Sequence, residues 1–508
     1  MAGSSFDFVK RTLSSSTAVS LASLLHSSDL SPRMPCGGNH RCGKCRVKVT
    51  GDVLPPSKEE LALLTREDAA QGIRLACFAQ VQGTVIVELP SESMDTLSLV
   101  SLPRCRPGGN GSGLAVDIGT TTIAMQLYDC SSGRLLGEDL AENRQRAFGA
   151  DVISRIEYAN RHTPVRLEEA IHRQLEEMAE LCLRRSGVSA PDRVVITGNT
   201  TMLHFWERLD PRGIAVSPFV PQSLFGCESR YPLCGALPFL PHCVGAYVGG
   251  DITCAVLASG MLQAPERTSL LIDLGTNGEI ALYHRGKLHC ASTALGPAFE
   301  GASLSCGMPA SPGAVCEVHM EEDGGVSFST IAAAPPVGIC GSGILDVIRL
   351  MLDQGILDET GRLCGSASTA KTEAGEPAWD LPGTGLRMTQ QDIRQIQLAK
   401  AAVCAGIQTL LETLGLTCED IEHFYIAGGF GHSMNVESAA RVGLFPSALK
   451  TRVQLLGNAS LSGAVFLLLE PRARDVLDQM RESAGEIPLS GNSTFSEYYI
   501  DNMLFETI

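Results

Sequence analysis

Four cysteines in the N-terminal part of the chain have the residue type and spacing of a metal-cluster site. Cys36, Cys42 and Cys45 lie together in the glycine-rich sequence PCGGNHRCGKC, and Cys77 follows in RLACFAQ. Three thiolates from one wrapped loop and a fourth from a distant turn are typical ligands of a 2Fe–2S cluster. The glycines allow the loop to curl so that backbone N–H groups can point at the sulfides. The pattern therefore predicts that these four cysteines bind a 2Fe–2S cluster.

A structural zinc site with four cysteine ligands is the alternative interpretation. Zinc ribbons usually contain two short C-x2-C pairs, and only Cys42 and Cys45 have that spacing in this region. His40 lies within the same loop, but four cysteines already complete either site. We therefore favour the iron–sulfur site and expect His40 to be a polar loop residue.

The segments around these cysteines indicate a small domain of short strands. VKVTGDV and TVIVELP read as strands, and the charged segment SKEELALLTRED between them reads as helical. This arrangement suits a β-grasp ferredoxin domain over residues 1–90. Residues 91–112 lose periodicity and end in RPGGNGS, which predicts a flexible linker.

After the linker, the sequence contains a loose internal duplication. GLAVDIGTTTIAMQLYD at 113–129 is echoed by SLLIDLGTNGEIALYH at 269–284, and VVITGN at 194–199 is echoed by FYIAGG at 424–429. Two copies at so long a period indicate a duplicated domain with a cleft between its halves, not a solenoid. We expect lobe 1 to span residues 113–262 and lobe 2 to span residues 263–508.

Each half carries a D-x-G-T turn that could bind phosphate. Such a turn places a carboxylate, backbone N–H groups and hydroxyls at one tight bend, and two facing turns can clamp a polyphosphate and its magnesium. One copy alone is weak support, because Asp-Gly turns are common in hairpins. Two copies, together with the glycine-rich sequences GICGSG at 338–343 and AGGFG at 427–431, favour a nucleotide site.

Composition restricts the partners and the compartment. The chain has 508 residues with 56 acidic and 40 basic side chains, for a net charge of −16. This charge repels phosphate backbones, so we expect no nucleic acid partner. The apolar runs are far shorter than the ~18 residues of a membrane span, so we expect no membrane association. Many of the 18 cysteines stand singly in apolar segments, which suits a reducing cytoplasm.

The combination of motifs resembles known families. The double D-x-G-T hairpins resemble the ATP-binding superfamily of actin, acetate kinase and sugar kinases. More narrowly, the chain is similar to the reductive activators of corrinoid proteins in the motifs VDIGTTT, ENRQRAFGADVISRI, GNTTMLH, GAYVGGD, IDLGTNGEI, GPAFEGA, GICGSGI, IQLAKAA, IAGGFG and VGLFP. This resemblance implies an α/β multidomain protein in which a β-grasp 2Fe–2S ferredoxin domain precedes a duplicated actin-like (RNase H-like) ATPase domain.

The resemblance also implies an activity. An enzyme of this kind uses ATP to move a low-potential electron from its cluster to the Co(II) of an inactivated corrinoid protein, which restores Co(I) for methyl transfer. The implied cofactors are a 2Fe–2S cluster, ATP and Mg2+, and the implied partners are a corrinoid protein, a low-potential electron donor and a second copy in a homodimer. The corrinoid itself is expected to belong to the partner, because the signature D-x-H-x2-G is absent from the sequence. Longer relatives carry an extra segment between the ferredoxin and ATPase parts, whereas residues 91–112 join them directly here.

Residue roles follow from the same resemblance. Asp117 and Asp273 would hold Mg2+, largely through water, and Asp251 or Glu300 would position the attacking water. The phosphate-binding residues would be Gly119, Thr120, Thr121, Thr122, Gly275, Thr276 and Asn277. The residues bordering adenosine would be Gly341, Ser342, Gly343, Gly428 and Gly429.

Three other functions remain open from the sequence. One is a small-molecule kinase fused to a ferredoxin domain, and another is an ATP-gated electron donor to a different reductase or dehydratase. The third is a non-catalytic scaffold, which would leave the clustered cysteines unexplained.

Overall fold

The computed structural model describes residues 8–26, 40, 45–64, 68, 71–90, 105–296, 298–299, 301, 304–321, 324–364, 370–372, 375–429 and 434–505. Three predicted site residues, Cys36, Cys42 and Glu300, lie outside the described residues. Among the described helices, none combines the length and apolar character needed to cross a membrane.

The N-terminal domain is built on a four-stranded antiparallel sheet with the order β1-β4-β2-β3. Alternate residues of the inner strands, such as Val47, Val49, Val85 and Val87, are buried in its apolar core. The predicted strands of this region are β2 and β4, and the described part of the charged helical segment includes the short α2. The elements are β1 (Phe8–Ser20), α1 (Leu21–His26), β2 (Arg46–Val53), α2 (Lys58–Leu61), β3 (Ile73–Leu75) and β4 (Gln80–Pro90).

Lobe 1 contains a six-stranded sheet with the order β7-β6-β5-β8-β10-β9. The long helix α5 ends at Gly187, whose left-handed conformation (φ 70°) is the usual helix stop. The elements are β5 (Ser112–Ile118), β6 (Thr122–Asp129), β7 (Arg134–Glu142), η1 (Arg144–Ala147), α4 (Val152–Arg161), α5 (Val165–Ser186), β8 (Arg193–Gly198), α6 (Thr200–Trp206), α7 (Arg212–Ala215), β9 (Cys227–Glu228), β10 (Phe239–Leu240), α8 (Gly250–Ser259) and η2 (Met261–Gln263).

Lobe 2 contains a second six-stranded sheet with the order β21-β20-β11-β12-β13-β22. Its elements are β11 (Ser269–Leu274), β12 (Gly278–His284), β13 (Lys287–Thr293), α10 (Gln390–Thr413), η4 (Cys418–Asp420), β20 (His423–Ala427), α11 (Val436–Val442), η5 (Ser447–Arg452), β21 (Val453–Gly457), α12 (Ala459–Leu469), α13 (Ala473–Ser483), β22 (Ala484–Glu486) and α14 (Ser493–Asp501). An insertion between β13 and α10 forms two small sheets and α9. Its elements are β14 (Ala314–Met320), β15 (Val326–Thr330), η3 (Ile331–Ala333), β16 (Gly338–Ile339), α9 (Gly341–Asp353), β17 (Ala370–Lys371), β18 (Pro377–Asp380) and β19 (Arg387–Thr389).

The two lobes repeat one topology, as the internal duplication predicts. The order β7-β6-β5-β8-β10 in lobe 1 matches β13-β12-β11-β20-β21 in lobe 2. In each lobe the strand that ends in the D-x-G-T aspartate pairs in parallel with the echoed strand, so Asp117 lies opposite Thr197 and Asp273 lies opposite Ala427. A helix follows the fifth strand of each set, α8 in lobe 1 and α12 in lobe 2. This is the duplicated actin-like architecture.

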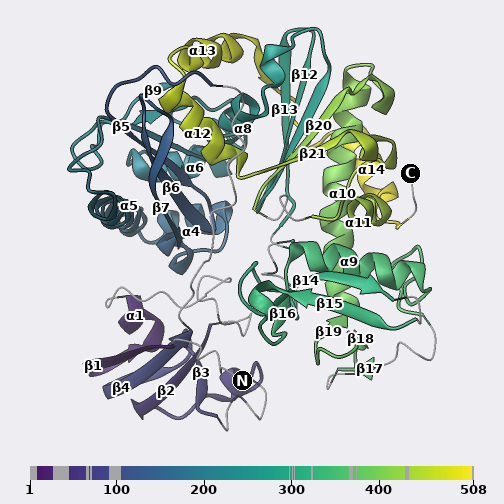
Figure 1. Cartoon of the computed structure of the whole chain (residues 1–508). Helices are drawn as coiled ribbons and strands as arrows, with labels where there is room; N and C mark the ends of the chain where they lie inside the picture. The colour runs from purple at the N-terminus through teal and green to yellow at the C-terminus, as the bar shows by residue number, and fades with distance from the viewer. Residues whose placement is uncertain are drawn as a thin grey trace.

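Helices α8 and α12 pack against each other between the two sheets (Figure 1). A Cβ atom at Gly463 of α12 would lie only 2.0 Å from the carbonyl oxygen of Cys254 in α8, so the close approach requires glycine there. An apolar core shared by the lobes surrounds this contact and includes Ala115, Val195 and Leu271. The N-terminal ends of α8 and α12 therefore lie where residues of both lobes can contact them.

The predicted flexible linker is partly attached to the ATPase domain. Arg106 N donates to the Glu470 carboxylate at 3.1 Å, and Gly108 N donates to the Leu469 carbonyl at 3.3 Å. The residues of RPGGNGS therefore run along the C-terminal end of α12 and then enter β5. Residues 91–104 of the predicted linker lie outside the described residues.

Candidate functional site

The first D-x-G-T turn lies between β5 and β6 and places Asp117 at the interface of the lobes. Ser460 Oγ donates to Asp117 Oδ1 at 2.9 Å, and Asn458 Nδ2 donates to Oδ2 at 3.1 Å. Both donors belong to the start of α12, where Asn458 also caps the helix. Burial raises the pKa of Asp117 to about 6, although the two hydrogen bonds oppose that rise. Lobe 2 thus contacts the carboxylate that lobe 1 supplies.

Asp251 occupies the equivalent place at the start of α8. Burial is the main reason that its pKa rises to about 8, and the nearby charges of Asp273 and Asp117 add to the effect. Asp273 comes from the second D-x-G-T turn, between β11 and β12 in lobe 2. Asp117 of lobe 1 therefore lies at the start of α12 from lobe 2, and Asp273 of lobe 2 lies near the start of α8 from lobe 1.

Glu279 is a further carboxylate of this region, only 7% exposed, to which the sequence motifs assign no role. It lies directly opposite Asp273 on the β11–β12 hairpin, and opposed residues of an antiparallel pair project from the same face. Burial, followed by the charges of Asp251 and Asp273, raises its pKa well above the usual range of a glutamate. The strand register of IDLGTNGEI could have indicated this residue. Neighbouring carboxyl groups therefore favour the protonated forms of Asp251 and Glu279, an effect that a divalent cation near Asp117 and Asp273 would oppose.

Two asparagine side chains fix the first D-x-G-T turn, in lobe 1. Gly119 is required at its bend, since a Cβ atom there would lie 2.6 Å from the Thr122 carbonyl oxygen. Asn143 Nδ2 donates to the Gly119 carbonyl at 2.8 Å. Asn199 Nδ2 donates to Thr120 Oγ1 at 3.0 Å. Neither asparagine is assigned a role by the sequence motifs, although a helix-capping asparagine directly after a buried strand is a recognisable signal for Asn199.

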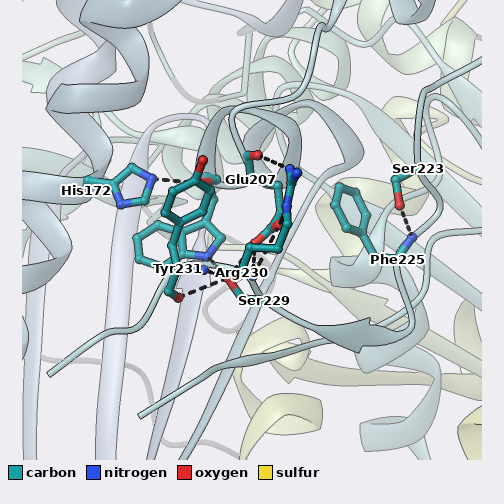
Figure 2. A network of polar contacts seen from close by, with 8 residues as sticks. His172, Glu207, Ser223, Phe225, Ser229, Arg230 and Tyr231 are labelled. Carbon is teal, nitrogen blue, oxygen red and sulfur yellow. Dashed lines mark hydrogen bonds and ion pairs between the residues drawn. The ribbon is translucent and has the colours of Figure 1, made fainter. Parts of the chain in front are cut away.

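The helix that begins at Asn199 is clamped at its other end by a polar network (Figure 2). Glu207, which follows α6 and is only 5% exposed, accepts hydrogen bonds from Ser229 Oγ and from Arg230 Nε, the latter at 3.0 Å. His172 Nε2 lies 2.8 Å from the Trp206 carbonyl oxygen, and its ring stacks on the Trp206 indole. These contacts hold α6 in place and so fix Asn199, which contacts the first D-x-G-T turn.

The predicted nucleotide residues of lobe 2 lie in two places. Gly275, Thr276 and Asn277 form the second D-x-G-T turn, which is closed by a 3.1 Å hydrogen bond from Gly275 N to the Asn277 carbonyl. Gly428 lies beside this turn at φ 111°, where a Cβ atom would approach the Leu274 carbonyl oxygen to 2.5 Å. Among the described atoms, none lies within 4 Å of a Cβ atom built on Gly429.

The other predicted adenosine residues begin α9. Gly341, Ser342 and Gly343 are buried in its first turn. A Cβ atom at Gly343 would lie 2.3 Å from the Val315 carbonyl oxygen, so packing against β14 already accounts for glycine at this position. α9 is joined to α11, which follows the Gly428–Gly429 segment, by a hydrogen bond from Ser438 Oγ to Asp346 at 2.5 Å.

Two of the four predicted cluster cysteines lie within the described residues and are close together. Cys45 Sγ and Cys77 Sγ are 3.3 Å apart, and both side chains are buried in the apolar core of the N-terminal domain. This separation exceeds the ~2.05 Å of a disulfide. It is near the distance of about 3.8 Å that separates two thiolates bound tetrahedrally to one metal ion at about 2.3 Å. His40 Nε2 lies 3.0 Å from the Cys77 carbonyl oxygen, and its ring stacks on Phe78.

A buried ion pair supports the turn that carries Cys77. Arg74 Nε and Nη2 donate to the two carboxylate oxygens of Glu60 at 2.9 and 2.8 Å. Leu75 N also donates to Glu60 Oε1 at 2.9 Å. Since Glu60 is 1% exposed, this bidentate contact is shielded from water and fixes the backbone just before the cysteine.

Comparison with protein families assigns each part of the chain. Residues 9–82 match the 2Fe-2S iron-sulfur cluster binding domain, which favours the iron–sulfur interpretation over zinc. Residues 112–264 match the RACo middle region, and residues 267–508 match the C-terminal ASKHA domain of RACo.

Individual relatives agree with this assignment. The corrinoid activation enzyme RamQ of Eubacterium limosum is 35% identical over 77% of this chain and 70% of its own length. The [Co(II) methylated amine-specific corrinoid protein] reductase of Methanosarcina barkeri is 25% identical over 78% of this chain and 77% of its own. A solved reductive activator for corrinoid,iron-sulfur protein is 28% identical, with a TM-score of 0.70 over 96% of this chain and 95% of its own. The chain therefore belongs to the family of reductive activators of corrinoid proteins.

Proposed function

We propose that this protein uses ATP to transfer one low-potential electron from its own 2Fe–2S cluster to the Co(II) of an inactivated corrinoid protein, regenerating Co(I). The observation that carries this proposal is the union, in one chain, of a 2Fe–2S domain and a duplicated ATPase domain that together match one solved corrinoid activator over 95% of its length. A kinase with a fused ferredoxin domain would not account for that full-length match.

The N-terminal domain fits the cluster. Cys45 and Cys77 are close enough to bind one iron, and Cys36 and Cys42 are proposed as the remaining ligands. The bound cluster would accept and release one electron at a time. The chain's own residues supply a buried apolar setting and the Glu60–Arg74 support for the cysteine-bearing turn.

The ATPase domain fits a magnesium–nucleotide complex. We assign Asp117 and Asp273 to the magnesium ion. Within the described part of the chain, no three acidic, histidine or cysteine side chains converge on one direct metal site. A magnesium ion here would therefore keep several water ligands, as this ion usually does. Asp251 is the proposed residue for orienting the attacking water, because it lies near both aspartates, and Glu300 remains the second candidate.

ATP is required because Co(I) is a stronger reductant than a typical cluster of this type. Each 59 mV of uphill transfer costs about 1.4 kcal/mol for one electron. In the proposed cycle one electron enters from a low-potential donor, one leaves to Co(II), and ATP and water are converted to ADP and phosphate. ATP binding can favour this transfer only by stabilising one arrangement of the protein with its partner. We further propose a homodimer that works in the cytoplasm.

The test is the visible spectrum of a purified corrinoid protein mixed with this protein and a low-potential reductant, with and without ATP. We expect Co(I) to accumulate only when ATP is present. ATP hydrolysis should also be slow alone and rise when the Co(II) corrinoid protein is added. If a sugar or short carboxylate accelerates hydrolysis and becomes phosphorylated, the protein is a kinase. If ATP-dependent reduction occurs only with another acceptor, it is a donor to a different reductase or dehydratase.

A further inference from the structure

One segment of lobe 1, residues 143–155, binds three successive carbonyl groups of the first D-x-G-T turn, which is the proposed first phosphate turn. At its start, Asn143 donates to the Gly119 carbonyl through Nδ2 at 2.8 Å and to the Thr121 carbonyl through its backbone N at 2.9 Å. At its end, the Arg155 guanidinium donates to the Thr120 carbonyl between them. Both side chains are at most 1% exposed. The backbone of the phosphate turn is thus fixed by the two ends of this segment.

The middle of the same segment contacts the ferredoxin domain. Ala147, the last residue of η1, is buried in the apolar cluster that also contains Cys45 and Cys77. Phe148 packs against that cluster on one side and against the core of lobe 1 on the other, where its ring centroid lies 5.0 Å from that of Tyr158. Figure 1 shows the ferredoxin strands beside the end of lobe 1 where α4 lies.

Internal contacts make residues 143–155 a rigid connection. Arg155 Nε donates to the Gly149 carbonyl at 3.0 Å. A Cβ atom at Gly149 would lie 2.7 Å from Arg155 N, so the chain doubles back closely here. Gln145, which is fully buried, donates to the Leu167 carbonyl at 2.9 Å and so ties the segment to the start of α5. A displacement of the phosphate turn would therefore be passed to Ala147 and Phe148.

We propose that residues 143–155 couple the two domains, so that ATP at the first phosphate turn stabilises docking of the ferredoxin domain on Ala147 and Phe148. This inference rests on the proposed function for the assignment of ATP to that turn. Phosphate contacts would further stabilise this conformation of the turn, whose carbonyls hold both ends of the segment in the arrangement that presents the docking surface. Because such coupling is reciprocal, docking must strengthen ATP binding by the same factor.

The experiment uses the full-length, cluster-loaded protein and a non-hydrolysable ATP analogue with Mg2+. Two variants disrupt the docking surface: Phe148→Ala removes apolar contact, and Ala147→Glu places a charge in it. The matched control is Phe219→Ala, a part-exposed phenylalanine of lobe 1 whose ring contacts Tyr247. The measurements are the Kd of the analogue and deuterium uptake across the strands of Arg46–Pro90.

In the wild-type protein and the control, we expect the analogue to lower deuterium uptake in the ferredoxin domain. In both docking variants this response should disappear, and the analogue should bind about fivefold more weakly or worse. The visible spectrum of the cluster and uptake in β5 and β8 report whether each variant is folded. Ala147→Glu remains informative if Phe148→Ala disturbs lobe 1, because Ala147 belongs to the ferredoxin cluster alone.

The coupling would be overturned if the analogue protected lobe 1 but left the wild-type ferredoxin domain unchanged, or if both variants kept the wild-type Kd and response. If the wild-type protein did not bind the analogue, the coupling and the nucleotide assignment would both fail. If the linkage were observed but no corrinoid protein were reduced, the proposed function would fail while the coupling stood.

Discussion

Ser460 of lobe 2 donates a 2.9 Å hydrogen bond to Asp117 of lobe 1, across 343 positions of the sequence. Because Asn458 binds the other carboxylate oxygen, the start of α12 holds both oxygens of the first D-x-G-T aspartate. The equivalent position at the start of α8 carries Asp251, which lies near the second D-x-G-T aspartate, Asp273. The pseudo-symmetric lobes therefore place the Ser460 hydroxyl at Asp117 but the Asp251 carboxylate near Asp273. The two halves of the site are chemically unequal.

Ser460→Ala should move the acidic limb of the ATPase pH profile to higher pH. Without this donor, burial acts on Asp117 with less opposition, and its pKa should rise above about 6. Hydrolysis measured between about pH 5 and pH 9 should fall most at the acidic end. Ser462→Ala is the control, because Ser462 Oγ donates to the Asn458 carbonyl of its own helix. An acidic limb that stays in place would show that ionised Asp117 is not needed.

Asp251→Asn should stabilise the ligand-free protein while slowing ATP hydrolysis. The folded-state pKa of Asp251 is about 8, above its ordinary value of 3.8, so the folded state favours the protonated acid. The free energy of unfolding should therefore fall as pH rises from about 4 to about 8. Asparagine cannot ionise, so the Asp251→Asn variant should not show this fall in the free energy of unfolding.

The measurement is Tm across that pH range for the wild-type and Asp251→Asn proteins. Their difference should be smallest at the acidic end and largest near pH 8, and in an ATPase domain of this size each kcal/mol corresponds to a Tm change on the order of 1 °C. Asp475→Asn, which changes an exposed acid in α13, should show no such growth. A variant that matched the wild-type protein at pH 8 would contradict the buried-charge account, and one that kept full hydrolysis would remove Asp251 as the water-orienting residue.

Glu60→Ala should destabilise the ferredoxin domain and release its cluster. The change leaves Arg74 buried without its bidentate partner, which typically costs about 3–5 kcal/mol. Loss of cluster absorbance during urea unfolding should occur at lower denaturant than in the wild-type protein. The exposed neighbour Glu59 provides the control, and Glu59→Ala should shift the midpoint little. Equal midpoints for the two variants would show that the ion pair does not support the Cys77 turn.

Asp117→Ala and Cys42→Ser should both abolish Co(II) reduction, but for different reasons. The first removes a proposed magnesium-binding carboxylate, so ATP turnover should be lost while the visible cluster spectrum stays intact. The second removes a proposed iron ligand, so the spectrum should be lost while basal ATP hydrolysis survives. Spectra and ATPase rates of both variants, recorded under a low-potential reductant, separate the two defects. Full Co(I) formation by the Asp117 variant would mean that ATP hydrolysis is not coupled to reduction.

The anaerobically purified protein should be brown and contain about two irons and two sulfides per chain. This prediction depends on Cys36, Cys42, Cys45 and Cys77 acting as the ligands. Metal analysis and visible absorbance provide the check. Stoichiometric zinc in a colourless protein would replace the ferredoxin assignment with a structural zinc site.

The local features of the fold could be predicted because they depend on neighbouring residues. Short apolar runs on both sides of each D-x-G-T turn predict the hairpins β5–β6 and β11–β12, and the repeated pattern predicts the duplicated architecture. The serine-rich strand β1 lacks a clear alternation, and only its long pairing with β4 identifies it as a strand. The contacts of Asp117 with Asn458 and Ser460 were not predictable, since they depend on how two distant lobes pack.

The same limit applies to the residues that fix the site. Asn143 and Arg155 lie in a motif quoted for family resemblance, but that resemblance assigned them no contact. Their binding of the first D-x-G-T turn depends on the path of residues 143–155 through lobe 1. The segment RPGGNGS, interpreted as flexible from its glycines, is instead held against the end of α12, because Glu470 and Leu469 accept hydrogen bonds from its backbone.

The attachment of RPGGNGS to the end of α12 limits how far the ferredoxin domain can move from the ATPase domain. The first turn of α12 contacts Asp117, and the residues at the other end of α12 bind the C-terminal part of the linker. These two ends of the helix are about 16 Å apart at 1.5 Å per residue. Residues 91–104 can span at most about 50 Å at ~3.5 Å per residue. An undocked ferredoxin domain would stay tethered by these residues. Its effective concentration near its own lobes would therefore be on the order of millimolar. Re-docking would therefore be an intramolecular event whose frequency depends on linker length and not on how much protein a cell contains.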